Sequence, residues 1–262
     1  MFPSERLAVV YFSLFAAAVL VAPGRLRRWR GFLGASGSAA GVILIASMAS
    51  ITARMWLCHA YLVAGYWLPA VLVSAASSPA FESWLQRSDL HVRRYLPQLP
   101  RWTTHFAELS YLMCYPALPA AFVVVWTWGT LVDAERFWAS VLAAGFTCYG
   151  SLPWLPSRPP RLLERFEESP ALREAPFRLA TVNTAVLARV SHQLNTFPSG
   201  HVAVAVAAAS SAFSVWWPAG LALGVVAAGI AIGAVAGRYH YVVDVILGAI
   251  VGFAAVAIFQ AF

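Results

Sequence analysis

Two histidines and an aspartate near the C-terminal end of the chain have the residue types and the spacing of a catalytic group. His240 and Asp244 are four residues apart, so a helix would place both side chains on one face, within hydrogen-bonding distance. A carboxylate that holds one imidazole nitrogen leaves the other nitrogen free and more basic, and such a histidine can act as a nucleophile or a base. The same pair could also be a buried ion pair that only locks two helices together.

The second histidine, His201, follows the sequence Pro198-Ser199-Gly200 at the start of an apolar segment. Unpaired backbone N–H groups at a helix N-terminus attract anions, and Ser199 is a candidate N-cap residue there. Gly200 would let a phosphate group approach the backbone closely, with the His201 side chain pointing toward it. Taken alone, this sequence could also be no more than a capped helix start.

Arginines near these residues could supply the positive charge that a phosphate group needs. They occur in the sequence Arg158-Pro159-Pro160-Arg161 and again at Arg238, two residues before His240. The planar guanidinium group matches phosphate oxygens in a way that lysine does not. Each of these arginines could instead be an anchor at the membrane interface.

The composition predicts a membrane-embedded scaffold around these residues. Of the 262 residues, 60% are hydrophobic and 11% are charged, and the mean hydropathy is +0.69, which is too apolar for an ordinary soluble domain. Several segments reach the roughly 20 apolar residues that cross a bilayer. We therefore expect an all-α, polytopic transmembrane helical bundle with six to eight spans. Our count is eight: Leu7–Val21, Phe32–Ala53, Trp56–Ser77, Phe106–Leu131, Phe137–Leu152, His201–Trp217, Ala219–Ala236 and Tyr239–Phe259.

The number of spans decides which residues can meet. Two spans lie between Gly200 and Arg238, so an up-and-down pair of helices would return the chain to the same side of the membrane and let the three clusters share one site. Only Arg54 interrupts the apolar run from Phe32 to Ser77, and one crossing more or less there would invert everything downstream. Glycines at four-residue spacing are expected to let helices approach closely; they are Gly229, Gly233, Gly237, Gly248 and Gly252.

The pattern changes between Pro79 and Pro100, where aromatic and aliphatic residues alternate with charged ones such as Glu82 and Asp89. This favours a helix at the membrane interface with its apolar side in the lipid boundary, although a solvated linker is the alternative. We accordingly divide the chain into N-terminal membrane helices with this interfacial segment, over residues 1–100, and a catalytic helical bundle over residues 101–262.

Charge and cysteine content limit the partners. All 18 basic residues are arginines, the net charge is +7, and arginines beside hydrophobic spans more often contact lipid headgroups than nucleic acid. Membrane lipids are therefore expected as partners, and nucleic acid is not. The three cysteines are widely spaced in apolar segments, as buried free thiols would be, and show no metal-ligand spacing. We expect no metal and no other cofactor, and the sequence does not indicate an oligomeric state.

Taken together and in this order, the three clusters resemble the motifs of the type 2 phosphatidic acid phosphatase superfamily, particularly its branch similar to inositol phosphorylceramide synthases. The resemblance implies that His240 is the nucleophile, Asp244 its partner, and His201 the general acid for the leaving oxygen. It also implies that the phosphate is bound by Arg161, Arg238, Ser199, Gly200 and Arg158.

The motifs also depart from the pattern of that superfamily. Its first motif usually begins with a lysine seven residues before an Arg-Pro pair; if Arg158 is that arginine, Ser151 takes the lysine's place. The Pro-Pro-Arg sequence that ends at Arg161 is more similar to the synthase-like branch, so we rank Arg161 above Arg158 as the phosphate ligand. The usual arginine of the third motif lies six residues before the histidine, at Ala234 here, whereas Arg238 is two residues before it.

The resemblance implies a membrane lipid phosphatase that hydrolyses a lipid phosphate or diphosphate through a phosphohistidine intermediate, without a metal. With an alcohol as acceptor, the same chemistry would make a lipid headgroup phosphotransferase. A non-catalytic phospholipid-binding or transport protein is the alternative of another class. It is disfavoured because recognition alone needs arginines rather than two imidazoles.

We expect an integral protein of a bacterial cytoplasmic membrane. Two indications of the side of the active site disagree. Four arginines, Arg25, Arg27, Arg28 and Arg30, place the first connection in the cytoplasm by the positive-inside rule, and the count of crossings then places the motifs there too. The resemblance favours the extracytoplasmic face, and this is the side that we expect.

Overall fold

The computed structural model covers the chain and describes residues 1–21, 28–72, 78–94, 106, 109–163, 194 and 196–261. These residues form α-helices and connections without a β-strand, which confirms the all-α prediction for this part of the chain. Arg25, Arg27 and the proposed boundary between residues 100 and 101 lie outside the described residues. The two-part division of the chain therefore stays a prediction.

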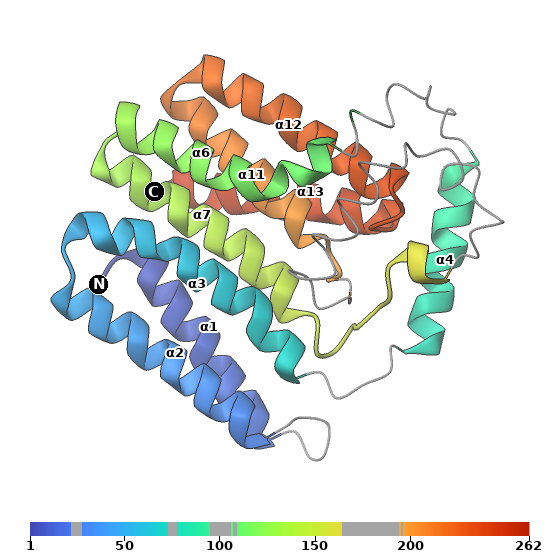
Figure 1. Cartoon of the computed structure of the whole chain (residues 1–262), viewed down its shortest axis with the longest axis horizontal. Coiled ribbons are helices and arrows are strands. Elements are labelled where there is room, and N and C mark those ends of the chain that lie inside the picture. Colours follow the sequence, from blue (N-terminus) through green and yellow to red (C-terminus); the bar gives the residue numbers. More distant parts are fainter. Residues whose placement is uncertain are drawn as a thin grey trace.

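The described residues form eight long helices that lie side by side, one for each predicted span (Figure 1). Ala49 and Ser50 separate the second helix from the third, so the apolar run that Arg54 interrupts is two helices joined by a tight turn. The helices are α1 (Pro3–Val21), α2 (Arg28–Met48), α3 (Ile51–Leu72), α6 (Cys114–Trp128), α7 (Leu131–Gly150), α11 (Gly200–Val215), α12 (Trp217–Ala236) and α13 (Val242–Gln260).

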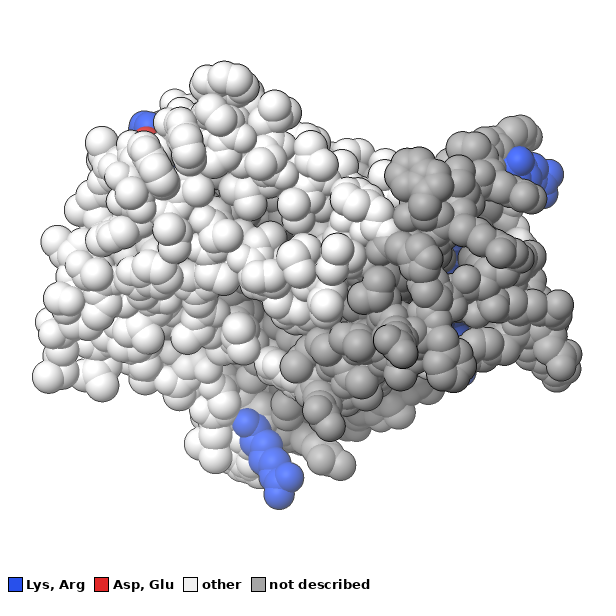
Figure 2. Space-filling view, turned by 45° about the horizontal axis from the view of Figure 1, so that its top comes forward, with Lys and Arg blue, Asp and Glu red and all other residues white. Residues whose placement is uncertain are grey.

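The helices suit a membrane in length and in surface chemistry. By length and composition, α1, α2, α12 and α13 can each cross a bilayer, and α6 and α11 are shorter apolar helices. Large apolar side chains such as Leu14, Leu33 and Phe253 are exposed, as expected where the solvent is lipid. Figure 2 shows few charged side chains on the described surface that it draws. The chain is therefore a polytopic helical membrane protein.

Short connections make the helices antiparallel within α1–α2–α3, within α6–α7 and within α11–α12–α13, and both chain termini lie at one end of the bundle (Figure 1). The opposite end, which we call the motif end, carries the start of α11, the turn between α12 and α13, and the start of α2 with Arg30. Helix α4 (Pro79–Arg93), outside the bundle, and the short helix α8 (Pro160–Leu163) also lie there. The predicted parity is thus confirmed, because the three clusters share one end.

The apolar core centres on α7, against which helices from both halves of the sequence pack. Tyr11 of α1 stacks on Phe146 of α7, with ring centroids 4.1 Å apart, and Phe122 of α6 contacts Trp138 of α7. Buried residues of α1, α2, α3, α6, α7, α11 and α13 belong to one continuous cluster. Trp128, the last residue of α6, stacks at 4.4 Å on Trp216, the residue after α11, so these two helices end at the same level.

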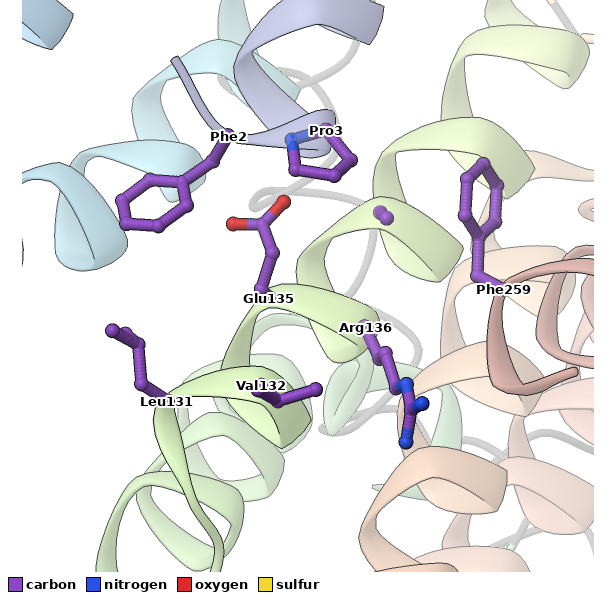
Figure 3. Close-up of a pocket in the computed structure, with 8 residues that line it drawn as sticks. Phe2, Pro3, Leu131, Val132, Glu135, Arg136 and Phe259 are labelled. Atoms are coloured by element: carbon purple, nitrogen blue, oxygen red, sulfur yellow. The ribbon is translucent and has the colours of Figure 1, made fainter. Parts of the chain in front are cut away.

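The end of the bundle away from the motifs is held by buried charges. Both Glu5 carboxylate oxygens accept hydrogen bonds from Arg54, at 2.7 and 2.6 Å, and Glu135 accepts two from Ser4. Beside them lies a cavity of about 320 Å³, in which the Glu135 carboxylate points toward the first residues of α1 (Figure 3). Because Ser4 already occupies both oxygens of Glu135, this end serves to attach the start of α1 to α7.

Glycines let the motif helices approach closely, as their spacing predicts. A Cβ atom on Gly248 of α13 would lie 2.5 Å from the carbonyl oxygen of Ser199, and one on Gly252 would lie 2.6 Å from that of Ala203. Gly229 of α12 faces Ser110 in the same way. The backbones of α11 and α13 can therefore touch where the motif residues lie.

Replacing Gly248 with alanine is expected to push α13 away from the start of α11. Overpacking of this kind typically costs about 1–3 kcal/mol of folding free energy. Gly224→Ala is the matched control, since no atom lies within 4 Å of the added methyl group and a helical Gly→Ala change stabilises by up to about 1 kcal/mol. Thermal unfolding in detergent measures both. Equal unfolding temperatures for the two variants would contradict the close contact.

Candidate active site

His240 and Asp244 lie side by side at the turn into α13. Arg238 takes a left-handed backbone conformation, with φ of 57°, between the end of α12 and His240. His240 Nδ1 lies 3.4 Å from Asp244 Oδ2, which also accepts a hydrogen bond of 3.2 Å from the Tyr241 N–H. Both side chains are buried. Asp244 thus engages Nδ1 of the imidazole and leaves Nε2 for a bound group.

His201 faces the same space from the first turn of α11. The ring centroids of His201 and His240 are 6.0 Å apart, and the ring planes meet at 66°. One phosphate group is large enough to touch both rings. A backbone hydrogen bond of 3.0 Å from the Ser199 N–H to the Asp244 carbonyl oxygen joins the two segments that carry these histidines.

Arg161 is the arginine that points into this site. Its backbone N–H donates a 3.1 Å hydrogen bond to the Arg238 carbonyl oxygen, and its guanidinium carbon lies 4.6 Å from the centre of the Tyr239 ring. Among the described residues, its buried Nε has no hydrogen-bond partner. Burial and the Arg161 charge lower the pKa of His240 to about 3, so the imidazole is neutral at physiological pH.

Arg158 and Arg238 are held by carboxylates instead. The Arg158 guanidinium forms two hydrogen bonds with Glu82, at 3.1 and 2.8 Å, and Arg238 Nη1 donates one of 2.8 Å to Asp89. Both carboxylates belong to α4. The helix predicted around Pro79 is confirmed, but its buried side carries two acids that face the protein. Each buried acid has an arginine as its partner, as a charge in an apolar surrounding requires.

Ser199 and Gly200 occupy the start of α11 in different ways. Ser199 is the residue before the helix, yet its side chain makes no capping hydrogen bond, and its buried hydroxyl has no partner among the described residues. The Gly200 N–H donates to Thr196 Oγ1 at 3.1 Å, and a Cβ atom on Gly200 would collide with the Tyr149 ring. The Ser199 hydroxyl is therefore available to a ligand, and Gly200 makes room for Tyr149.

Tyrosines around His201 are functional candidates that the sequence analysis missed. Ring centroids of Tyr111, Tyr66 and Tyr115 lie 5.7, 6.4 and 6.4 Å from that of His201, and Tyr111 stacks on Tyr239 at 4.2 Å. Tyr111 and Tyr115 are four residues apart near the start of an apolar span, which was a usable signal. Tyr66 lies in another helix and had none.

A largely apolar cavity of about 410 Å³ begins at this site. It follows α11 from His201 to Ala209, which is about 12 Å along a helix axis. Other walls come from Leu62 of α3, Leu118 of α6 and Ala227 of α12. His201 therefore faces His240 on one side and a space suited to a hydrocarbon chain on the other.

Comparison with known families gave one match. A family model described as "PAP2 superfamily" matches residues 80–258, more than two thirds of the chain. The matched region includes α4 from its second residue and all three motif clusters. Comparisons with curated proteins and with solved structures gave no match.

The environment of His240 predicts its titration. Because burial and Arg161 lower its pKa, the His240 imidazole is expected to stay neutral at pH 5, where an ordinary histidine is charged. Removing the guanidinium in Arg161→Gln should raise this pKa toward 6.5, since a positive neighbour disfavours the imidazolium ion. ¹⁵N-histidine NMR titration of the protein in detergent measures it. Arg136→Gln, at the other end of the bundle, is the control, and an unchanged His240 pKa in Arg161→Gln would refute the assignment.

Proposed function

The chain belongs to the PAP2 superfamily, and from this premise we propose that it is a membrane lipid phosphatase that works through a phosphohistidine at His240. Membership supports a phosphatase or phosphotransferase in general. The geometry of the three clusters supports the roles of the individual residues, and the cavity that begins at His201 supports a lipid as substrate.

In the proposed first step, Nε2 of neutral His240 attacks phosphorus, and the bond from phosphorus to the leaving oxygen breaks as the N–P bond forms. His201 gives its proton to the leaving oxygen, and the bound phosphate favours the protonated form of His201 beforehand. Water then attacks phosphorus while the now neutral His201 accepts its proton, and the N–P bond breaks to release phosphate from His240. Arg161, the Ser199 hydroxyl and the positive end of α11 stabilise the charge on the phosphoryl oxygens.

The cavity along α11 is the observation that supports a lipid as the substrate. A soluble phosphoester would need no apolar space of this size beside the reacting group. The small side chains of Ala205, Ala208 and Ala209 line it within a membrane helix, so a hydrocarbon chain can lie there while its phosphate contacts His201.

A phosphotransferase is the second candidate, and the position of Arg161 favours it. Of the two arginines in the first cluster, Arg161 lies at the site and Arg158 is bound by Glu82. This agrees with the Pro-Pro-Arg pattern of the branch similar to inositol phosphorylceramide synthases. An alcohol that attacks phosphorus on the phosphohistidine, in place of water, would complete the transfer. Counting free phosphate against transferred product, with and without alcohol acceptors, decides between the two.

Filling the cavity should impair only lipid substrates. In Ala205→Phe, the ring would occupy the path of the hydrocarbon chain, so kcat/KM should fall about tenfold or more with a long-chain lipid phosphate and stay near wild type with a soluble aryl phosphate. Ala222→Phe, on the exposed side of α12, is the control. Equal effects on both substrates would contradict a lipid-binding cavity.

A metal chelator in the assay should not change turnover. Activity that returns only with magnesium would contradict the metal-free mechanism.

The two histidines should differ in their dependence on the leaving group. General acid catalysis typically contributes about 10²- to 10⁴-fold, so His201→Ala should lose that much with an alkyl or prenyl phosphate and far less with an aryl phosphate that leaves as a stable anion. His240→Ala should abolish both activities, and Asp244→Asn should lower both. Steady-state kinetics on the two substrates measures this. Appreciable activity in folded His240→Ala protein would show that the nucleophile lies elsewhere.

We further propose that the motif end faces the extracytoplasmic side, which puts both chain termini in the cytoplasm. A single cysteine at Ser169, between the first two clusters, should then react with a membrane-impermeant reagent on intact cells. A single cysteine at Ala261, at the opposite end of the bundle, should be protected. Both are made in a variant without Cys58, Cys114 and Cys148. The reverse labelling pattern would place the active site in the cytoplasm.

A further inference from the structure

Helix α4 contacts each of the three segments that carry the motif clusters. Glu82 binds Arg158 of the first cluster, and Asp89 binds Arg238 of the third. Phe81 packs against Phe197, three residues before Gly200 of the second, with ring centroids 5.2 Å apart. Helix α4 thus binds Arg158, which is 76 positions after Glu82, and Arg238, which is 149 positions after Asp89.

Glu82 binds both the backbone and the side chain of Arg158 in the first cluster. Oε1 of Glu82 accepts hydrogen bonds from the Arg158 backbone N–H, at 2.8 Å, and from Arg158 Nε, at 3.1 Å, while Oε2 accepts one from Nη2. Two prolines follow directly, and they limit how far the chain can turn before Arg161. The position of the Arg161 guanidinium therefore depends on the hydrogen bonds between Glu82 and Arg158.

Asp89 holds the segment that carries His240 at two points. Its Oδ2 accepts from Arg238 Nη1 at 2.8 Å, and its Oδ1 accepts from the Val242 backbone N–H at 3.1 Å. These two residues flank His240 on either side. Asp89 thus caps the first turn of α13 and closes the left-handed turn at Arg238, so that the imidazole has one orientation toward Asp244.

The inward face of α4 is built for these contacts. Glu82, Leu85 and Asp89 are buried and recur at the three- and four-residue spacing of one helix face, while Gln86 and Arg87 are exposed. Apolar residues in place of buried ion pairs hold helices together equally well. Two carboxylates on this face therefore point to control of geometry rather than to stability alone.

We propose that α4 is a positioning clamp, in which Glu82 sets the position of the phosphate-binding Arg161 and Asp89 sets the position of the nucleophile His240. The inference rests on the proposed function. Neither acid touches the substrate, and each acts through the segment that it binds. The two clamp contacts therefore predict two different kinetic defects.

Neutralising Asp89 should affect the chemical step. In Asp89→Asn the segment around His240 loses its charged partner, and a displaced nucleophile should lower kcat about 10²-fold, equally for lipid and aryl phosphates, with little change in KM. Glu82→Gln should instead raise KM about tenfold and weaken binding of orthovanadate to the same extent, because Arg161 is displaced. Gln86→Ala, on the exposed side of α4, should match wild type.

Asp89→Glu keeps the charge and both acceptor oxygens, so its kcat should lie between those of Asp89→Asn and the wild type. It also provides a second variant at this position in case Asp89→Asn does not fold. Thermal unfolding identifies folded protein for each comparison. Wild-type kcat and KM in folded Asp89→Asn and Glu82→Gln would overturn the clamp, as would identical defects in both. A wild-type protein without turnover on any phosphoester would overturn the proposed function instead, and vanadate binding in the Glu82→Gln and Gln86→Ala proteins would still test the clamp.

Discussion

One backbone hydrogen bond, from the Ser199 N–H to the Asp244 carbonyl oxygen, sets the geometry of the motif end. It joins the residue before α11 to the first turn of α13, so the N-terminal ends of two helices lie side by side. Gly248 permits this contact, because any side chain there would meet the Ser199 carbonyl group. The two imidazoles take their spacing from it, and the positive ends of both helix dipoles point at the space where a phosphate would bind.

The charges at this end are arranged by the cost of burying them in an apolar bundle. A charged group away from water needs a partner. Buried Arg238 has its partner in Asp89, and buried Glu82 has its partner in the half-exposed Arg158. Arg161 differs from these two arginines, since among the described residues its charge faces Tyr239 and His240 rather than a carboxylate. A bound phosphate can supply the missing negative charge, so phosphate binding would also neutralise the Arg161 guanidinium.

Much of this arrangement could be predicted from the residues, because membrane helices follow directly from apolar length. The eight helices of the bundle and the meeting of the three clusters at one end required only hydropathy and parity. The turn between α2 and α3 lies at Ala49 and Ser50, a few residues before the predicted break at Arg54. The acids of α4 could not be predicted, since the charges between its aromatic residues resemble those of any interfacial helix, and nothing in the local pattern identifies an arginine 149 positions away. Tyr66, which lies near His201, could not be predicted for the same reason: an aromatic residue in an apolar span has no distinguishing neighbour until the helices pack.

The stacked pair of Trp128 and Trp216 has a consequence for the membrane around the protein. Helices α6 and α11 end level at these rings and contain 15 and 16 residues, so they extend about 22–24 Å, less than the roughly 30 Å of a typical hydrocarbon layer. A hydrocarbon layer of typical thickness that begins at these rings would extend past the start of α11, so either headgroups and water reach in to His201 or the layer is thinner there. A thinner host membrane would relieve this mismatch, so the same chain should experience a different mechanical environment in membranes of different thickness.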